Sequence, residues 1–137
     1  MNEQIDTLFL KIIAGELPSF KIYEDQYTYA FLAAHPNSVG HTLVIPKKYS
    51  RNIYDTDPET LGHIMNTVSL VATHLRDVLA CDGMNIYQNN EVAGFQAVFH
   101  IHFHLIPRYT GDGFAHFPIN ESLIAQLPDI HKKLQML

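Results

Sequence analysis

With 137 residues, 47% of them hydrophobic, the chain has the length and composition of one globular domain, which we expect to span residues 1–137. Its formal net charge of −5 and the scarcity of clustered Lys or Arg argue against duplex nucleic acid as a partner. The single cysteine excludes an internal disulfide, and no run approaches the roughly 18 apolar residues of a membrane span, so we expect a cytoplasmic protein without a membrane partner.

The first half of the chain predicts a short helix followed by three strands. Asp6 can cap a helix whose apolar residues have helical spacing and which ends at Gly15. Runs of aromatic and β-branched residues then favour strands at residues 20–23, 27–32 and 42–45. The stretch between the second and third strands is a loop rich in Pro, Asn, Ser and Gly, and a proline ends the third strand.

The second half predicts the longest helix, two more strands and a helical tail. Asp57 caps the helix, Pro58 opens it, and one apolar stripe continues to about Asp82. A strand at residues 84–88, a turn-rich loop and a histidine-containing strand follow. The tail has helical spacing that Pro128 either breaks or restarts. Together these elements predict an α+β fold in which a long helix packs on an antiparallel sheet of about five strands.

The segment FHIHFHLIPRY, residues 99–109, places three histidines at every second position. Because side chains alternate between the two faces of a strand, His100, His102 and His104 should share one face, and the apolar residues between them should meet the core on the other. A polar strand face exposed to solvent would explain a single histidine better than three in register. Two functional interpretations remain, a metal site and direct catalysis.

A metal site would need ligands from outside this histidine row. With a rise of ~3.3 Å per residue, the outer histidines stand roughly 13 Å apart at their Cα atoms. Zinc–nitrogen bonds are only ~2.0–2.1 Å long, so one ion could join neighbouring histidines but hardly all three. The candidates for further ligands are His35, His41, Asp112 and His116, and none of them has a diagnostic spacing.

Direct catalysis needs no further ligand. A neutral imidazole is a good nucleophile near pH 7, because its ordinary pKa is ~6.5. It can attack phosphorus and form a phospho-histidine that water later cleaves. A neighbouring imidazole can meanwhile donate a hydrogen bond or a proton to the anionic transition state. The row therefore suits chemistry at phosphorus.

The row resembles the His-φ-His-φ-His-φ-φ signature of the histidine triad (HIT) superfamily of nucleotidyl hydrolases and transferases, where φ is an apolar residue. The resemblance extends through FLKIIAGELPSFKIYEDQYTYAFL, GHTLVIPKKY, DGMNIYQNN, QAVFHIHFHLIPRY and GDGF, in the order found in Hint-like members. It implies a HIT-like fold with one long helix and short terminal helices. It also implies a homodimer in which the long helix and the strand before the triad pair with a second copy.

The resemblance implies a role for each histidine. His102 would be the nucleophile on the α-phosphorus of a nucleotide, and His104 would lie beside the phosphate or the leaving group. The backbone carbonyl of His100 would accept a hydrogen bond from His102, so that the other ring nitrogen points at phosphorus. His41, in GHTLVIP, would be a supporting fourth histidine.

Nucleotide binding is implied for the second and third triad histidines and for the turn-rich loop before them, whose backbone N–H groups would meet phosphate oxygens. Within this loop, Asn89 matches an Asn that contacts the nucleotide, and Gln96 matches a Gln just before the triad. Ala97 occupies a position that is usually hydroxylic, and Phe95 replaces a glycine. Outside the loop, Ala33 replaces an acid that holds the ribose hydroxyls. These departures leave the chemistry intact and put the substrate in question.

Many Hint-like proteins bind zinc through two cysteines, a histidine after the Ile-Pro-Lys step and the first triad histidine. The matching positions here are Thr7, Leu10, Tyr49 and His100, and a single ligand does not make a tetrahedral site. We therefore expect no metal and no cofactor.

The leading hypothesis is a hydrolase or transferase that acts at the α-phosphate of purine nucleoside phosphoramidates or dinucleoside polyphosphates, through a nucleotidyl-histidine intermediate. Its expected partners are a small-molecule nucleotide and a second copy of the chain. One alternative is a nucleotide-binding protein that has lost turnover through Ala33, Phe95 and Ala97. A further alternative is a metal-dependent enzyme or metal-binding module that uses His102 and His104.

Overall fold

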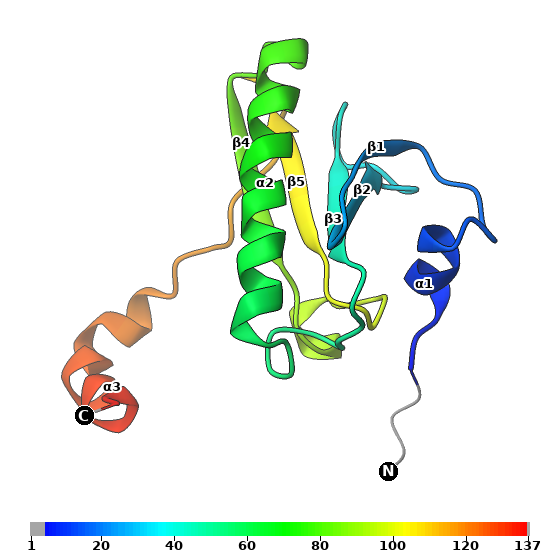
Figure 1. The fold of residues 1–137 in the computed structure, drawn as a ribbon. Helices are drawn as coiled ribbons and strands as arrows, with labels where there is room; N and C mark the ends of the chain where they lie inside the picture. Colours follow the sequence, from blue (N-terminus) through cyan, green and yellow to red (C-terminus); the bar gives the residue numbers. More distant parts are fainter. Residues whose placement is uncertain (1–4, 137) are drawn as a thin grey trace.

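A five-stranded antiparallel sheet carries the fold, with its strands in the order β1-β2-β3-β5-β4 (Figure 1). The computed structural model describes residues 5–136. The strands are β1 (Lys21–Glu24), β2 (Thr28–Leu32), β3 (Thr42–Pro46), β4 (Gly83–Gln88) and β5 (Phe103–Arg108). The helices are α1 (Leu8–Ile13), α2 (Pro58–Leu79) and α3 (Leu127–Leu134), with the 3₁₀ segments η1 (Val92–Gly94) and η2 (Glu121–Gln126). The expected α+β fold with one long helix and short terminal helices is confirmed.

Helix α2 covers one face of the sheet (Figure 1). Asp57 caps it as expected, since its carboxylate accepts the N–H of Thr60 at 2.7 Å, and Pro58 lies in the first turn. The buried stripe of the helix packs on apolar side chains of three strands. This cluster comprises Ala30, Val44, Ile64, Val68, Val71, Leu75, Ile101 and Leu105.

The C-terminal end of α2 comes earlier than expected and positions the loop that precedes β3. The helix ends at Leu79 rather than near Asp82, because Ala80 adopts a left-handed conformation with φ 51°. Leu79 then lies directly against Gly40, where an added Cβ would come within 2.4 Å of the Leu79 Cδ1 atom. Gly40 also has a φ of 91°, so the approach that places His41 beside the sheet requires glycine.

The opposite face of the sheet is covered unevenly. Helix α1 places its buried residue, Phe9, on a second apolar cluster with Tyr29, Phe31, Leu43 and Ile45. The N-cap of α1 is Thr7, whose side chain makes no capping bond, and the expected cap Asp6 lies one position earlier, where its carboxylate accepts the N–H of Leu8 at 3.2 Å. Over β4 and the end of β5, the same face borders a cavity.

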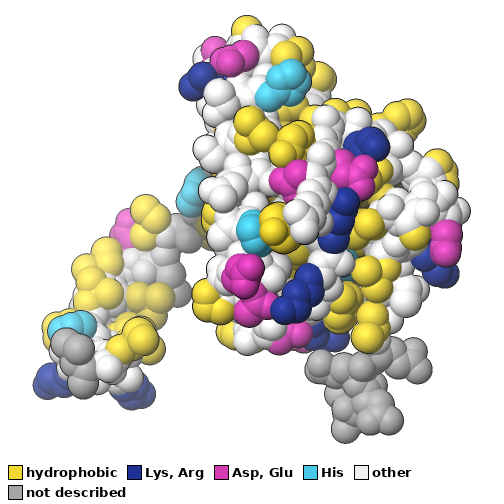
Figure 2. Space-filling view, viewed as in Figure 1, with side chains coloured by type: hydrophobic (Ala, Val, Ile, Leu, Met, Phe, Trp, Pro, Cys, Tyr) yellow, Lys and Arg dark blue, Asp and Glu magenta, His cyan; other side chains and the backbone are white. Residues whose placement is uncertain are grey.

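Beyond β5 the chain leaves the sheet. Residues 113–136 form a tail that extends away from the body (Figure 1) and carries hydrophobic side chains over its surface (Figure 2). Every residue of this tail except the half-buried Ile130 is exposed. Pro128 lies in the first turn of α3, so it restarts the helix. Between residues 5 and 136, none of the helices combines the length and the apolar character that crossing a bilayer requires.

Candidate active site

The histidine row lies where β5 begins. Strand β5 starts at Phe103, so only His104 belongs to it, while His100 and His102 precede it in an irregular segment. The expectation that one strand holds all three was therefore wrong. The alternation nevertheless persists, because the apolar residues between the histidines join or pack on the cluster under α2 and the row faces the α1 side.

Hydrogen bonds from distant segments replace the sheet ladder ahead of β5. The carboxylate of Asp6 accepts the N–H of Phe99 at 2.8 Å, and the hydroxyl of Tyr49 donates to the carbonyl of Phe99 at 2.6 Å. The N–H of Ile101 donates to the carbonyl of Ser50 at 2.9 Å. These bonds hold the segment in place where its pairing with β3 and β4 has ended.

The first two histidines are buried, which excludes the interpretation of a solvent-exposed polar face. His100 is 0% exposed and His102 is 7% exposed. The ring of Phe9 stands edge-on to both, with centroid distances of 5.6 Å to His100 and 5.1 Å to His102. Helix α1 therefore seals this end of the row with one aromatic ring.

His102 is held in one neutral form. Its Nδ1 atom lies 2.7 Å from the carbonyl oxygen of His100, as the family resemblance implies. A carbonyl oxygen only accepts hydrogen bonds, so Nδ1 carries the proton and donates it. In neutral His102 the lone pair is therefore on Nε2, the nitrogen that is available for attack.

A second hydrogen-bonded chain fixes His104. The backbone N–H of Asn37 donates to Nδ1 of His41 at 3.0 Å, so neutral His41 carries its proton on Nε2. That nitrogen lies 3.0 Å from Nδ1 of His104 and donates to it. His104 consequently carries its own proton on Nε2. The row thus presents a lone pair on His102 beside an N–H on His104, with ring centroids 4.9 Å apart.

Burial favours the neutral form of all four histidines. It lowers the pKa values of His41, His100 and His102 below the ordinary value of 6.5. For His104, burial together with the neighbouring His102 and His41 lowers the pKa to about 3. The four side chains are therefore neutral at pH 7, which a nucleophilic His102 requires.

The surroundings of His100 do not fit a zinc site. Its Nε2 donates to the carbonyl of Pro46 at 2.8 Å, and its Nδ1 is buried with no hydrogen-bond partner among residues 5–136. The positions that match the family's other zinc ligands in sequence hold Thr7, Leu10 and Tyr49, which are not zinc ligands of the usual cysteine and histidine kind. One imidazole nitrogen alone does not hold a structural zinc ion.

Of the other candidate metal ligands in the sequence, most do not lie beside the histidine row. His41 joins it, but Asp112 binds Arg108 at 2.7 Å, and His35 and His116 are exposed. Within the part of the chain that the structure describes, no three His, Cys, Asp or Glu side chains converge on a position for a metal ion.

The loop before the triad is stabilised by its own hydrogen bonds. Gln96 is buried, and its side-chain amide accepts the N–H of Glu91 at 2.8 Å and donates to the carbonyl of Arg51 at 2.7 Å. Glu91 forms a two-pronged ion pair with Arg51, with N–O distances of 2.7 and 2.8 Å, which lowers the pKa of its carboxyl group. Gln96 thus holds the loop, and a nucleotide contact through its side chain stays a prediction.

Several N–H groups of the loop at residues 89–97 are already engaged in hydrogen bonds. Those of Glu91, Gly94, Phe95 and Gln96 are bound within the loop. The N–H of Ala97 has no acceptor among residues 5–136. Ala97 can therefore contact phosphate through its backbone, although it lacks a hydroxyl group.

Phe95 adopts a left-handed backbone conformation with φ 68°. Glycine adopts this conformation freely, whereas for other residues it costs roughly 1–2 kcal/mol. The Phe95 ring is 75% exposed, so little core packing offsets that cost. The conformation gives the physical reason why a glycine suits this position.

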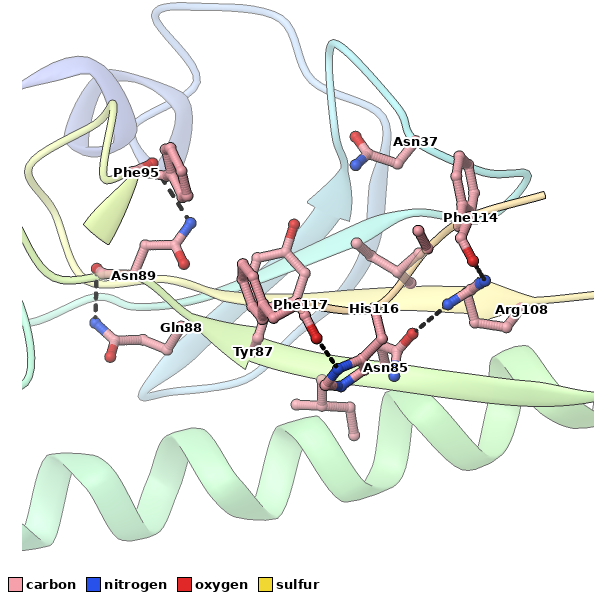
Figure 3. A pocket seen from close by; sticks show the side chains of 13 residues that line it. Asn37, Asn85, Tyr87, Gln88, Asn89, Phe95, Arg108, Phe114, His116 and Phe117 are labelled. Atoms are coloured by element: carbon pink, nitrogen blue, oxygen red, sulfur yellow. Dashed lines mark hydrogen bonds between the residues drawn. The ribbon is translucent and has the colours of Figure 1, made fainter. Parts of the chain in front are cut away.

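A cavity of about 640 Å³ adjoins the row on the β4 side (Figure 3). Tyr87 connects the two, because it pairs with His104 across β4 and β5 and also lines the cavity. The Tyr87 and His104 rings stack, with centroids 4.7 Å apart and planes inclined by 21°. Asn89 lines the same cavity, where its amide donates to the carbonyl of Phe95 at 3.4 Å. The tail segment 114–117 forms a further wall.

Sequence reasoning found neither Tyr87 nor Asn37. The register of β4 against β5 brings Tyr87 to His104, and the residue pattern alone does not specify that register. Asn37 acts through its backbone N–H, which every residue except proline supplies, so its identity carries no signal.

Comparison with known proteins identifies the family. The family model described as HIT domain matches residues 14–111. The chain belongs to the HIT family. Among the relatives of this HIT protein, Protein hit from Bacillus subtilis is 44% identical over 108 residues, which are 78% of this chain and 74% of that protein. Adenosine 5′-monophosphoramidase HNT1 from Saccharomyces cerevisiae is 37% identical over 93% of this chain and 79% of its own length.

A solved structure shows the same fold. The crystal structure of a zinc-bound histidine triad family protein from Mycobacterium smegmatis is 38% identical to this HIT protein. The match covers 92% of this chain and 96% of that chain, with a TM-score of 0.75. The expected HIT-like fold is therefore confirmed, while the roles of the individual site residues stay predictions.

Proposed function

We propose that this HIT protein binds a nucleotide and cleaves a bond at its α-phosphorus, releasing a nucleoside monophosphate from purine nucleoside phosphoramidates or dinucleoside polyphosphates. The observation that carries the proposal is the 2.7 Å bond from Nδ1 of His102 to the carbonyl of His100, which leaves the lone pair on Nε2. The name of the yeast relative, adenosine 5′-monophosphoramidase, supports the same reaction.

In the first step, Nε2 of His102 attacks the α-phosphorus, and the bond from phosphorus to the leaving nitrogen or oxygen breaks. The Nε2–H group of His104 donates a hydrogen bond to the phosphate oxygens, where negative charge collects in the transition state. Because His104 is neutral in the resting site, the proton that the leaving atom takes up comes from water.

In the second step, water attacks the phosphorus of the nucleotidyl-histidine. The bond from phosphorus to Nε2 of His102 breaks, and its electron pair returns to the ring nitrogen. The attacking water releases one proton, which balances the proton that the leaving group took up. The two steps together consume one water molecule and regenerate the neutral row.

A substrate panel tests the reaction. The purified protein is incubated with adenosine and guanosine phosphoramidates and dinucleoside polyphosphates, and the release of nucleoside monophosphate is followed by chromatography. Turnover together with a covalent adduct of nucleoside monophosphate mass would support the proposal. Binding without turnover on every substrate would instead indicate a non-catalytic nucleotide-binding protein. Complete loss of turnover on chelation would indicate a metal-dependent enzyme.

We also propose that the protein works as a homodimer. Strand β4 is an edge strand, and exposed apolar side chains lie on it at Ile86, on α2 at Leu70 and Val78, and along the tail. A second copy would cover such an edge most simply. Light scattering should give twice the 15.6 kDa of one chain, and the mass of a single chain at micromolar concentration would contradict the dimer.

We further propose that the protein is located in the cytoplasm. Cys81 is a free cysteine, and free thiols persist in a reducing compartment.

A further inference from the structure

The main chain around His100 determines how the nucleophile is held. The carbonyl of His100 accepts the Nδ1–H of His102 at 2.7 Å, and the N–H of the same peptide unit, on Ile101, donates to the carbonyl of Ser50 at 2.9 Å. A carbonyl accepts a hydrogen bond well only near the plane of its own peptide group, so the orientation of this unit decides whether the bond forms. The other boundary of that orientation is the main chain of Phe99.

Two side chains hold the main chain of Phe99. The carboxylate of Asp6 accepts its N–H at 2.8 Å, and the hydroxyl of Tyr49 donates to its carbonyl at 2.6 Å. The Tyr49 hydroxyl also accepts the N–H of Asp6 at 3.4 Å, so the two residues are joined as well. We call this set, Asp6, Tyr49 and the main chain of Phe99, the Phe99 clip. Between residues 5 and 136, no further side chain except His102 bonds to the main chain of residues 99–101.

The clip uses both carboxylate oxygens of Asp6. Oδ2 accepts the N–H of Phe99, and Oδ1 accepts the N–H of Leu8, the first residue of α1, at 3.2 Å. An amide of the same shape offers one acceptor oxygen and one NH₂ group, so it cannot accept both N–H groups. Asp6 thus ties the start of α1 to the segment that carries the nucleophile. Helix α1 in turn supplies Phe9, whose ring stands edge-on to the first two histidines.

Asp6 also brings a negative charge to the buried end of the row. Burial lowers the pKa of His102, while the hydrogen bond to the His100 carbonyl and the charge of Asp6 act in the opposite direction. Attack on phosphorus puts positive charge on the His102 ring, since Nε2 gains a bond while Nδ1 keeps its proton. A carboxylate near a buried ring favours that charge more than it would in water.

We propose that Asp6 and Tyr49 are positioning residues for the reaction proposed above, on which this inference rests. The Phe99 clip keeps the His100 carbonyl aimed at Nδ1 of His102 and thereby keeps the lone pair on Nε2. The carbonyl itself is main chain and survives any substitution, but its direction depends on the clip. Because the clip acts through the main chain, it serves the chemical step rather than the binding of substrate.

The first test measures kcat and KM with adenosine 5′-phosphoramidate as the substrate. Tyr49→Phe removes one hydrogen bond and keeps the ring, so kcat should fall about fivefold. Asp6→Asn leaves one N–H group without an acceptor and removes the charge, so kcat should fall about 10–100-fold. KM should stay unchanged in both variants, because neither substitution removes a group that we assign to substrate binding.

Tyr23→Phe and Asp25→Asn are the matched controls. Asp25 accepts the N–H groups of Tyr27 and Thr28 at 2.8 Å, and the hydroxyl of Tyr23 donates to it at 3.1 Å. This pair lies beside α2, where the hydroxyl of Thr67 donates to Asp25 at 3.4 Å, whereas the row faces α1. The control substitutions remove comparable hydrogen bonds, so they should lower Tm as the clip variants do and leave kcat unchanged.

A spectroscopic test needs no turnover. Long-range proton–nitrogen NMR spectra of histidine rings distinguish the two neutral forms, and His102→Ala identifies the signals of His102. In the wild type at neutral pH, His102 should show a single form with its proton on Nδ1. In Tyr49→Phe and Asp6→Asn, a second form with the proton on Nε2 should appear, because the carbonyl no longer holds the Nδ1–H group in place.

The outcomes separate the clip from the reaction. If the wild type releases no adenosine monophosphate, the proposed reaction is wrong, and the clip has no reaction to serve. If the wild type turns over and both clip variants keep its kcat, or the controls lower kcat as much, the clip is merely structural and the inference is overturned while the reaction stands. A single Nδ1–H form of His102 in both clip variants would overturn it as well.

Discussion

The two ends of the histidine row are built in opposite ways. At one end, His100 and His102 lie under the ring of Phe9, which is 3% exposed, and one ring N–H of each donates to a main-chain carbonyl oxygen. At the other end, His104 stacks on Tyr87 beside an open cavity, whose Phe95 and Phe117 rings face solvent.

This difference separates the residues that fix the proton positions of the row from the residues that line the cavity. The proton positions on His41, His100 and His102 follow from main-chain partners, which side-chain substitution does not remove. The cavity is lined by side chains from an edge strand, a loop and the tail, which can change with less effect on the core.

The largest effect should come from breaking the buried end at His102. His102→Ala removes the nucleophile and should lower kcat by roughly 10⁴-fold or more, as for other covalent catalysts. Nucleotide binding, followed by calorimetry, should persist, and the covalent adduct should be absent. His131→Ala, on the exposed face of α3, is the control and should behave as the wild type. Normal turnover by His102→Ala would refute the mechanism.

A smaller loss of activity should follow when His104, which contacts both His102 and Tyr87, is replaced. His104→Ala removes the N–H donor but keeps the nucleophile, so kcat should fall by about 10²–10³-fold. The adduct should still form, only more slowly, in rapid-quench measurements. A loss as complete as that of His102→Ala would show that His104, rather than its neighbour, carries the bond-forming step.

The free energy of unfolding should depend on the buried end of the row and hardly at all on the cavity wall. Phe9→Ala empties a buried position and should lower the free energy of unfolding by about 3–5 kcal/mol. Phe117→Ala changes an exposed ring and should alter that free energy by no more than about 0.5 kcal/mol. Urea titrations of both variants measure the contrast. Equal effects would show that the cavity wall is as much a part of the core as Phe9.

Acid should destabilise the histidine row at both of its ends. The histidines of the row have lowered pKa values, so between pH 6.5 and the lowered value, about 3 for His104, the folded protein binds fewer protons than the unfolded chain. Stability is therefore complete above pH 6.5 and falls as the pH decreases, by up to about 1.4 kcal/mol per pH unit for each histidine. Activity should fall over the same acid range, since protonated His102 cannot attack.

Urea midpoints measured from pH 6.5 to 5 test whether stability falls as the pH decreases. This interval lies above the range in which most carboxylates titrate. His104→Gln provides the control, because removing one of the shifted groups should flatten the slope. A midpoint that stays constant or rises as the pH falls would contradict the burial argument.

The smallest expected effect concerns metal. Because Thr7, Leu10 and Tyr49 leave His100 as a lone ligand, elemental analysis should find no stoichiometric zinc. Treatment with a chelator should leave both Tm and kcat unchanged. About one zinc ion per chain would show that the buried end is held by metal rather than by the contacts of Phe9 and the main chain.

The parts of this architecture that local sequence dictates could be predicted, and the parts that depend on register could not. Asp57 and Pro58 specify where α2 begins, because a cap and a first-turn proline act within a few residues. The end of α2 depended on a left-handed Ala80, which has no sequence signature. The start of β5 at Phe103 depended on anchors from Asp6 and other distant segments.

The same reasoning holds for the site. The bond from His102 to the carbonyl of His100 joins residues two apart and followed from the family resemblance. The stacking of Tyr87 on His104 and the cavity beyond it combine β4, the loop before the triad and the tail. No single stretch of sequence contains that combination, so it appears only when the elements are placed in space.

The hydrogen bond from Phe99 to Asp6 spans 93 residues, and this has a consequence for how the protein is made. On a ribosome that adds about 5–20 residues per second, Asp6 is synthesised on the order of 5 to 20 s before its partner exists. During that time the chain can form α2 and the first three strands, but the segment that holds His100 and His102 has not been translated. The candidate site is therefore completed only after the segment from Phe99 to His104 has been synthesised and has met Asp6.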